Sequence, residues 1–82
     1  MYDTGPLTSL APGEEAMIID TPHDTDLSRR LLDLGFIPRT RIRCVLVGHG
    51  AQSAAYRIRG TTIALRKEDA SQIVIHYHRP GR

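Results

Sequence analysis

A stripe of leucines gives the clearest hydrophobic pattern in the chain. Leu27, Leu31 and Leu34 follow one another at intervals of four and three residues, which is the spacing that places side chains on one face of an α-helix. Directly before the stripe, Asp24 or Thr25 can accept hydrogen bonds from the free N–H groups of a first helical turn. The pattern therefore predicts a helix that begins at these residues.

The residues after the stripe predict where the helix ends. Gly35 suits the left-handed position that commonly follows the last helical turn. Pro38 lacks the N–H group and the conformational freedom that a continuing helix would require. Beyond Pro38 the hydrophobic residues recur at every second position, which is the period of a β-strand.

Alternating positions predict about five strands, one before the helix and four after it. The stretches with this pattern are "EEAMIID", "TRIRCVLV", "AYRIR", "TTIALR" and "IVIHY". In the second stretch, Ile42, Cys44 and Leu46 are expected on one face and the intervening residues on the other. Short connections favour a mainly β fold with a helical insertion, in which the strands close into a small antiparallel barrel. A flat two-layer sheet is the alternative.

The chain length limits the number of domains. With 82 residues there is room for one domain and one small core, so we expect a single domain over residues 1–82 with loose tails at 1–6 and 79–82. Hydrophobic residues make up 40% and charged residues 24% of the chain, which is typical of a globular protein.

Cysteine use and apolar run length indicate the compartment. A single cysteine excludes an internal disulfide framework and a zinc site built from cysteine pairs. The apolar runs are far shorter than the roughly 20 residues that a membrane-spanning helix needs, and the first residues do not resemble a secretory signal. We therefore expect a cytoplasmic protein.

Reactive motifs are missing from the sequence. It contains neither of the glycine-rich patterns that cradle phosphate groups. Cys44 lies in the middle of a predicted strand, where a small buried hydrophobic side chain is a better interpretation than a nucleophile. We expect no enzymatic activity and no required cofactor.

Two histidines form a candidate metal site. His76 and His78 lie two residues apart on a predicted strand, so their imidazoles should point to one face and could bind a transition metal. Two imidazoles make an incomplete site, and Glu68 or Asp69 are only conjectural neighbours. An exposed strand end is the alternative interpretation.

Arginines are the other candidate feature. Net charge is +2, and several arginines alternate with apolar residues on the predicted strands: Arg41, Arg43, Arg57, Arg59 and Arg66. This alternation favours a solvent-exposed sheet face over a nucleic-acid interface, and few aromatic residues are available for base stacking. We therefore expect no nucleic-acid partner, while docking to an acidic protein or an anionic membrane stays open.

Three short motifs follow one another in order along nearly the whole chain. The first contains Leu7, Leu10 and Gly13. The second contains Arg30, Leu31, Leu34, Gly35 and Pro38. The third contains Arg59, Gly60, Ala64, Leu65, Arg66, Ala70 and Ile73. Together they resemble the ferrous iron transport protein A (FeoA) family, which usually has a glycine where this chain has Arg39.

The resemblance implies a fold and a function. It implies an SH3-like small β-barrel and a small accessory protein of bacterial ferrous iron uptake. Such a protein would act by contact on the membrane ferrous iron transporter and its cytosolic G-protein domain, in the cytoplasm or peripherally at the inner membrane. A nucleic-acid-binding or metal-sensing module is the alternative, and the loop "GHGAQSA" could support weak self-association.

The helix is the candidate docking surface for that partner. We hypothesise that Leu27, Arg30, Leu31 and Leu34, with the groove beside the helix, contact the transporter. The alternative is that every leucine belongs to the core and that Arg30 is a local brace between helix and strand.

Overall fold

The computed structural model describes residues 2–78 and places six strands, two α-helices and two short 3-10 helices in that range. In chain order these are β1 (Tyr2–Pro6), η1 (Leu7–Ser9), β2 (Glu15–Asp20), α1 (Asp26–Leu34), β3 (Arg41–Val47), η2 (His49–Ala51), β4 (Ser53–Ile58), β5 (Thr61–Arg66), α2 (Lys67–Ala70) and β6 (Val74–His78). The mainly β fold with a helical insertion is confirmed.

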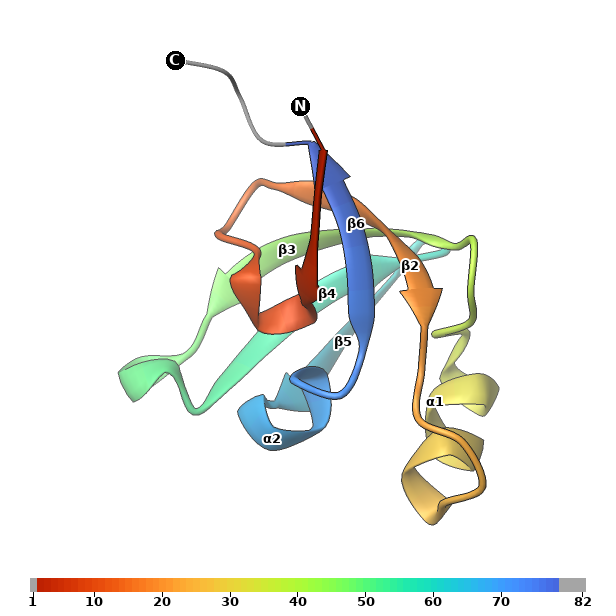
Figure 1. The fold of residues 1–82 in the computed structure, drawn as a ribbon. Helices are drawn as coiled ribbons and strands as arrows, with labels where there is room; N and C mark the ends of the chain where they lie inside the picture. The colour runs from red at the N-terminus through yellow and green to blue at the C-terminus, as the bar shows by residue number, and fades with distance from the viewer. Residues whose placement is uncertain (1, 79–82) are drawn as a thin grey trace.

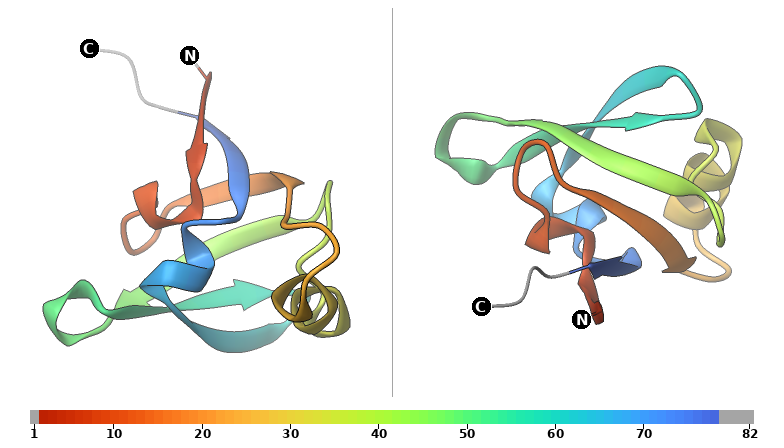
Figure 2. Two further views of the ribbon diagram at one scale, coloured as in Figure 1. Left: turned by 60° about the horizontal axis from the view of Figure 1, so that its bottom comes forward. Right: turned by 90° about the horizontal axis from the view of Figure 1, so that it is seen from above.

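The strands form one sheet in the order β1-β6-β2-β3-β4-β5, and every neighbouring pair is antiparallel. The sheet curves strongly, so that β1, β6 and β2 lie across the core from β3, β4 and β5 (Figures 1 and 2). Helix α1 lies at one end of this curved sheet, in the connection between β2 and β3 (Figure 1). Within residues 2–78, every helix falls short of the length and apolarity that a membrane crossing demands.

The core draws its side chains from nearly every element. Its buried members are Leu7, Leu10, Ala16, Ile18, Leu31, Phe36, Ile42, Cys44, Tyr56, Ile58, Leu65, Ala70, Ile73 and Ile75. Strand residues alternate between this core and solvent, as the period of two predicts. No buried polar or charged residue interrupts the core among the described residues.

The first strand corrects the prediction of a loose tail at residues 1–6. Tyr2–Pro6 form β1, which pairs with β6 along its whole length, from Tyr2 opposite His78 to Pro6 opposite Val74. The stretch buries little side-chain surface and ends in Gly5 and Pro6, so it has neither the alternation nor the composition of a typical strand. Residue 1 and the predicted tail at 79–82 lie outside the described residues.

A β-bulge corrects the predicted face of Leu46. Ile42 and Cys44 are buried as expected, but the register between β3 and β4 shifts between Cys44 and Leu46. The extra residue in β3 turns the following side chains over, so Leu46 is 59% exposed. Alternation in the sequence cannot reveal an inserted residue.

Cys44 and Tyr56 are neighbours on β3 and β4 in the middle of the core. Burial raises the pKa of the Cys44 thiol, because the thiolate would lose its hydration. Burial, with a smaller contribution from Cys44, raises the pKa of Tyr56 to about 12. The prediction that Cys44 is a buried hydrophobic side chain is confirmed.

Candidate docking groove

Helix α1 begins and ends where the sequence predicts. The Thr25 hydroxyl accepts a hydrogen bond from the Ser28 N–H at 3.0 Å, and the Ser28 hydroxyl accepts one from the Thr25 N–H at 3.0 Å. This reciprocal capping satisfies two N–H groups that the first turn would otherwise leave free. Gly35 closes the helix with a φ of 98°, a conformation that glycine adopts without strain.

The leucine stripe divides between the core and the surface. Leu31 is fully buried and Leu27 is half-buried against the core. Leu34 is 39% exposed, so it can contact a partner directly. Because Leu31 has no exposed surface, it can support docking only by holding the helix in place.

A groove lies where α1, α2 and β5 meet. Its volume is about 460 Å³. It is lined by Arg30 and Leu34 from α1, Ala64, Leu65 and Arg66 from β5, and Glu68 and Asp69 from α2. Two of the four predicted docking residues, Arg30 and Leu34, therefore line one groove. Leu27 and Leu31 do not.

An ion pair bridges the two helices at this groove. Arg30 Nη2 lies 3.1 Å from Asp69 Oδ2 and donates a hydrogen bond to it. The Asp69 side chain is 20% exposed, while that of Arg30 is 61% exposed. Arg30 thus connects α1 to α2, and most of its surface still faces solvent. This bridge joins two helices, so it differs from the local brace between helix and strand that the alternative hypothesis expected, while docking through Arg30 stays a prediction.

Arginines without an ionic partner among the described residues lie along the strands next to α1, and one of them, Arg66, lines the groove. Arg41 and Arg43 both approach Glu15, at 3.7 Å and 3.9 Å. By contrast, three exposed arginines of β4, β5 and the turn between them form no ion pair with another described residue: Arg57, Arg59 and Arg66. β4, β5 and the turn between them therefore carry three arginines that no described carboxylate neutralises.

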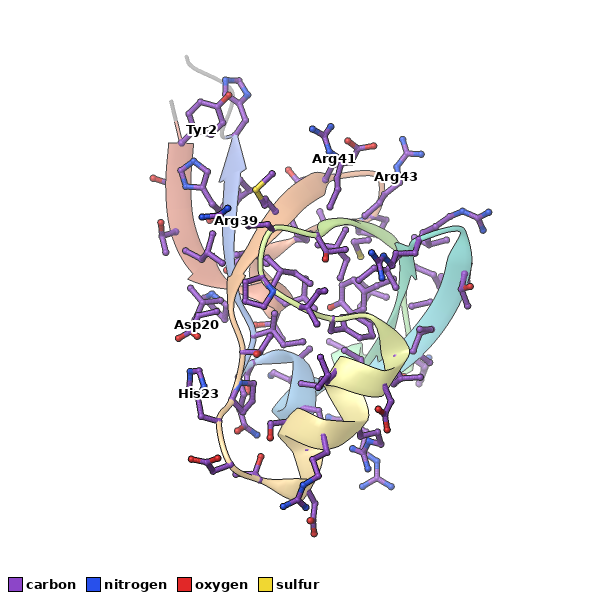
Figure 3. All side chains as sticks on the ribbon, turned by 90° about the vertical axis from the view of Figure 1, so that its right-hand side faces the viewer. Tyr2, Asp20, His23, Arg39, Arg41 and Arg43 are labelled. Atoms are coloured by element: carbon purple, nitrogen blue, oxygen red, sulfur yellow. The ribbon has the colours of Figure 1, made fainter. Side chains whose placement is uncertain are left out.

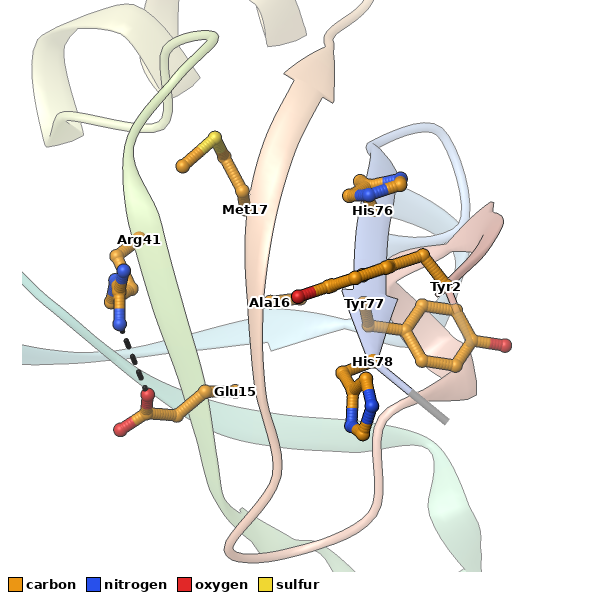
Figure 4. Close-up of a pocket in the computed structure, with 8 residues that line it drawn as sticks. All are labelled: Tyr2, Glu15, Ala16, Met17, Arg41, His76, Tyr77 and His78. Carbon is orange, nitrogen blue, oxygen red and sulfur yellow. Dashed lines mark ion pairs between the residues drawn. The ribbon is translucent and has the colours of Figure 1, made fainter. Parts of the chain in front are cut away.

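The histidine pair lies on β6, next to the edge strand β1 that carries Tyr2. His76 and His78 are both exposed and share one face of β6. The Tyr2 ring stacks on His76 with centroids 4.9 Å apart and meets His78 edge-on at 5.1 Å (Figure 4). It thus occupies the space between the imidazoles, and a metal shared by the two would have to displace it. Among residues 2–78, no group of three or more His, Cys, Asp and Glu side chains could hold a metal ion. The metal site stays a prediction.

Arg39 makes a tight turn that favours glycine. It lies in the loop between α1 and β3 (Figure 3). Its φ is 73°, and its N–H donates a hydrogen bond to the Ile18 carbonyl at 2.6 Å. A side chain in this left-handed conformation is strained. The glycine that the resemblance leads one to expect here would adopt this conformation without strain.

The FeoA domain model matches residues 5–76. This chain belongs to the FeoA family. The match covers most of the chain, including α1, β5 and the groove between them, so the resemblance inferred from the three motifs is confirmed. No curated protein matches the chain.

Solved FeoA structures have the same fold. A FeoA-like protein from Clostridium acetobutylicum is 21% identical, with a TM-score of 0.86 over 100% of this chain and 95% of that chain. Iron(II) transport protein A from Clostridium thermocellum is 29% identical, with a TM-score of 0.83 over 88% of this chain and 44% of that chain. Zinc-bound FeoA from Stenotrophomonas maltophilia, described as a prokaryotic SH3 domain protein, is 24% identical, with a TM-score of 0.72 over 92% of this chain and 98% of that chain. The predicted SH3-like fold is confirmed.

Proposed function

We propose that this FeoA protein is a cytoplasmic accessory protein of ferrous iron uptake that binds the membrane ferrous iron transporter at its cytosolic G-protein domain. The family is linked to ferrous iron transport. The relative from Clostridium thermocellum carries that function in its name, and the one from Stenotrophomonas maltophilia is described as a candidate activating factor for ferrous iron transport. Binding, rather than catalysis, is the proposed mode of action.

The groove between α1 and β5 is the observation that supports docking. Its α1 wall presents an exposed apolar side chain, Leu34, one turn away from an exposed guanidinium, Arg30. Protein interfaces commonly combine an apolar contact with arginine hydrogen bonds in this way. The buried Leu31 fixes the wall against the core, so the groove is largely formed before a partner arrives.

A double variant in the groove wall tests this function. Arg30→Glu with Leu34→Asp should weaken binding to the transporter's G-protein domain at least about tenfold, because it reverses one contact charge and removes the apolar contact. Isothermal titration calorimetry measures the affinity, and ferrous iron uptake in cells that lack the native protein measures the consequence. Binding and uptake equal to those of the unaltered protein would contradict the proposal.

Strands β2 and β3, outside the groove, supply a matched control. Met17 is 38% exposed, close to the 39% of Leu34, and Arg41 also faces a carboxylate, that of Glu15 at 3.7 Å, although this contact is looser than the 3.1 Å bond between Arg30 and Asp69. Met17→Asp with Arg41→Glu therefore makes the same chemical changes outside the groove. This control should bind the G-protein domain with unchanged affinity.

A further inference from the structure

Strand β5 has one edge without a neighbour. It is the last strand in the order β1-β6-β2-β3-β4-β5, and it pairs with β4 alone among the described residues. Such an edge offers a row of backbone N–H and C=O groups to another strand. The groove of about 460 Å³ is lined by three consecutive β5 residues, Ala64, Leu65 and Arg66, so this strand is accessible there.

The turn before β5 determines which backbone groups are free. Ile58 faces Thr61 across a two-residue turn, and both turn residues have a positive φ, Arg59 at 51° and Gly60 at 81°. In such a turn the flanking pair exchanges both of its hydrogen bonds, and bonded pairs then recur at every second position. The bond from the Lys67 N–H to the Gln52 carbonyl at 2.9 Å continues this alternation. Residues 61, 63 and 65 therefore bond to β4.

The alternate residues of β5 direct their backbone groups away from β4. These residues are Thr62, Ala64 and Arg66. Arg66 is also the N-cap of α2, so its carbonyl accepts the first bond of that helix and only its N–H is free. Over its six residues β5 contains no proline, and its pairing with β4 runs without a bulge. Proline and bulges are two of the devices that protect sheet edges from pairing. The backbone of β5 is thus suited to accept a further strand.

The arginines along this edge favour an acidic strand, although Glu68 and Asp69 also line the groove and Asp69 is already paired with Arg30. Arg57 donates a hydrogen bond to the Thr62 hydroxyl at 3.2 Å but forms no ion pair with another described residue, and neither do Arg59 and Arg66. A second copy pairing through the same edge would bring these arginines together, and like charges on neighbouring strands repel. A segment with acidic side chains would instead neutralise them.

We propose that β5 receives an extended, acidic segment of the partner as an added strand, bonded to the backbone of Thr62, Ala64 and Arg66. This inference rests on the proposed function and specifies how the G-protein domain is held. Main-chain hydrogen bonds would supply affinity, and the arginines beside the edge would select a segment with carboxylates. Leu34 and Arg30, on the α1 wall of the groove, would contact its side chains.

Residue-resolved amide hydrogen exchange of the full chain tests the added strand without any substitution. Addition of the transporter's G-protein domain should slow exchange at the Thr62, Ala64 and Arg66 amides at least about tenfold, because each becomes hydrogen-bonded. The amides of residues 61, 63 and 65 are already bonded to β4 and should change much less. Binding without added protection at the first three amides would overturn the added strand and leave the proposed function standing.

A matched pair of substitutions tests the same edge independently. Ala64→Pro removes an outward N–H group and keeps the bonds to β4, whereas Ala64→Val keeps the N–H group and changes only the side chain. The proline variant should bind the G-protein domain at least about tenfold more weakly than the valine variant and should restore less iron uptake in cells. Equal uptake by the two folded variants would overturn the added strand, whichever part of the transporter is contacted. Protection that grows with protein concentration in the absence of the domain would identify a second copy as the occupant and would also overturn it.

Discussion

The two outermost strands of the sheet differ in how well their free edges could accept a further strand. β1 ends in Gly5 and Pro6, and its Tyr2 ring packs sideways against the histidines of β6. β5 contains neither glycine nor proline, and unpaired arginines lie beside it. Glycine and proline make a strand a poor template for further pairing. The β1 edge is thus a poor template for a further strand, whereas the β5 edge has the backbone and the charges that our proposed acidic strand requires.

The largest expected effect is the loss of stability when the buried leucine beneath the groove is shortened, compared with the exposed leucine on the groove wall. Leu31→Ala should lower the free energy of unfolding by about 2 to 4 kcal/mol, because it leaves a cavity under α1. Leu34→Ala should lower it by less than about 1 kcal/mol, because that side chain is partly exposed. Urea unfolding measures both values. Similar losses for the two variants would contradict the division between core and groove.

The next largest effect is a loss of folding stability at alkaline pH, caused by the buried Tyr56. The pKa of Tyr56 is raised to about 12, above the usual tyrosine value of about 10. The folded protein therefore keeps a proton that the unfolded chain loses. The resulting stabilisation is fully present below about pH 10 and is lost as pH rises to about 12, by roughly 2 to 3 kcal/mol.

The titration of Tyr56 can be removed by a conservative substitution. Tyr56→Phe keeps the buried ring and deletes the ionisable hydroxyl, so the loss of stability between pH 10 and 12 should become smaller. The raised pKa of the Cys44 thiol acts in the same direction, so a weaker pH dependence should persist in the variant. Unfolding free energies measured across this pH range provide the check, and identical profiles for both proteins would rule out Tyr56 as the source.

A smaller effect should appear at the β1 edge. Tyr2→Ala removes the stacked contact with His76 and the edge contact with His78, which should destabilise β1 by about 0.5 to 1.5 kcal/mol. Amide exchange in β1 should become faster while binding of the G-protein domain stays unchanged. A large loss of binding in this variant would instead place the docking surface at the β1 edge and contradict the proposed one at α1 and β5.

The smallest effect is a gain in stability beside α1. Arg39→Gly relieves the strain at a φ of 73° but gives the unfolded chain more freedom, so a net gain of about 0.5 to 1 kcal/mol is expected. A thermal unfolding scan measures it. Lower stability would show that the Arg39 side chain makes a contact that stabilises the fold by more than the backbone strain destabilises it.

Sequence patterns predicted the elements whose side chains divide between core and solvent. Leu31 and Gly35 allowed α1 and its end to be predicted, because the spacing of a helix and the glycine of a left-handed end are both visible in a single sequence. Leu46 was assigned to the wrong face because a bulge adds one residue and reverses the alternation. β1 could not be predicted because it is held by backbone pairing with a strand more than 60 residues away, and such pairing does not require a particular composition in β1.

The candidate site was predicted only in part for a related reason. Arg30 and Leu34 belong to a motif near the predicted helix end, so both could be named in advance. Their partners in the groove, such as Ala64 and Asp69, come from β5 and α2, and only the fold brings these elements to α1. The free backbone groups of β5 depend on strand order, which local patterns do not contain.

A chemical-shift map of the isotope-labelled full chain, titrated with the transporter's G-protein domain, tests the central claim most directly. We predict that the changes concentrate in α1 around Arg30 and Leu34 and along β5, while β1 and the Tyr2–His76–His78 cluster stay unperturbed. Changes centred on β1 and β6, with α1 and β5 unaffected, would contradict the assignment of the docking surface.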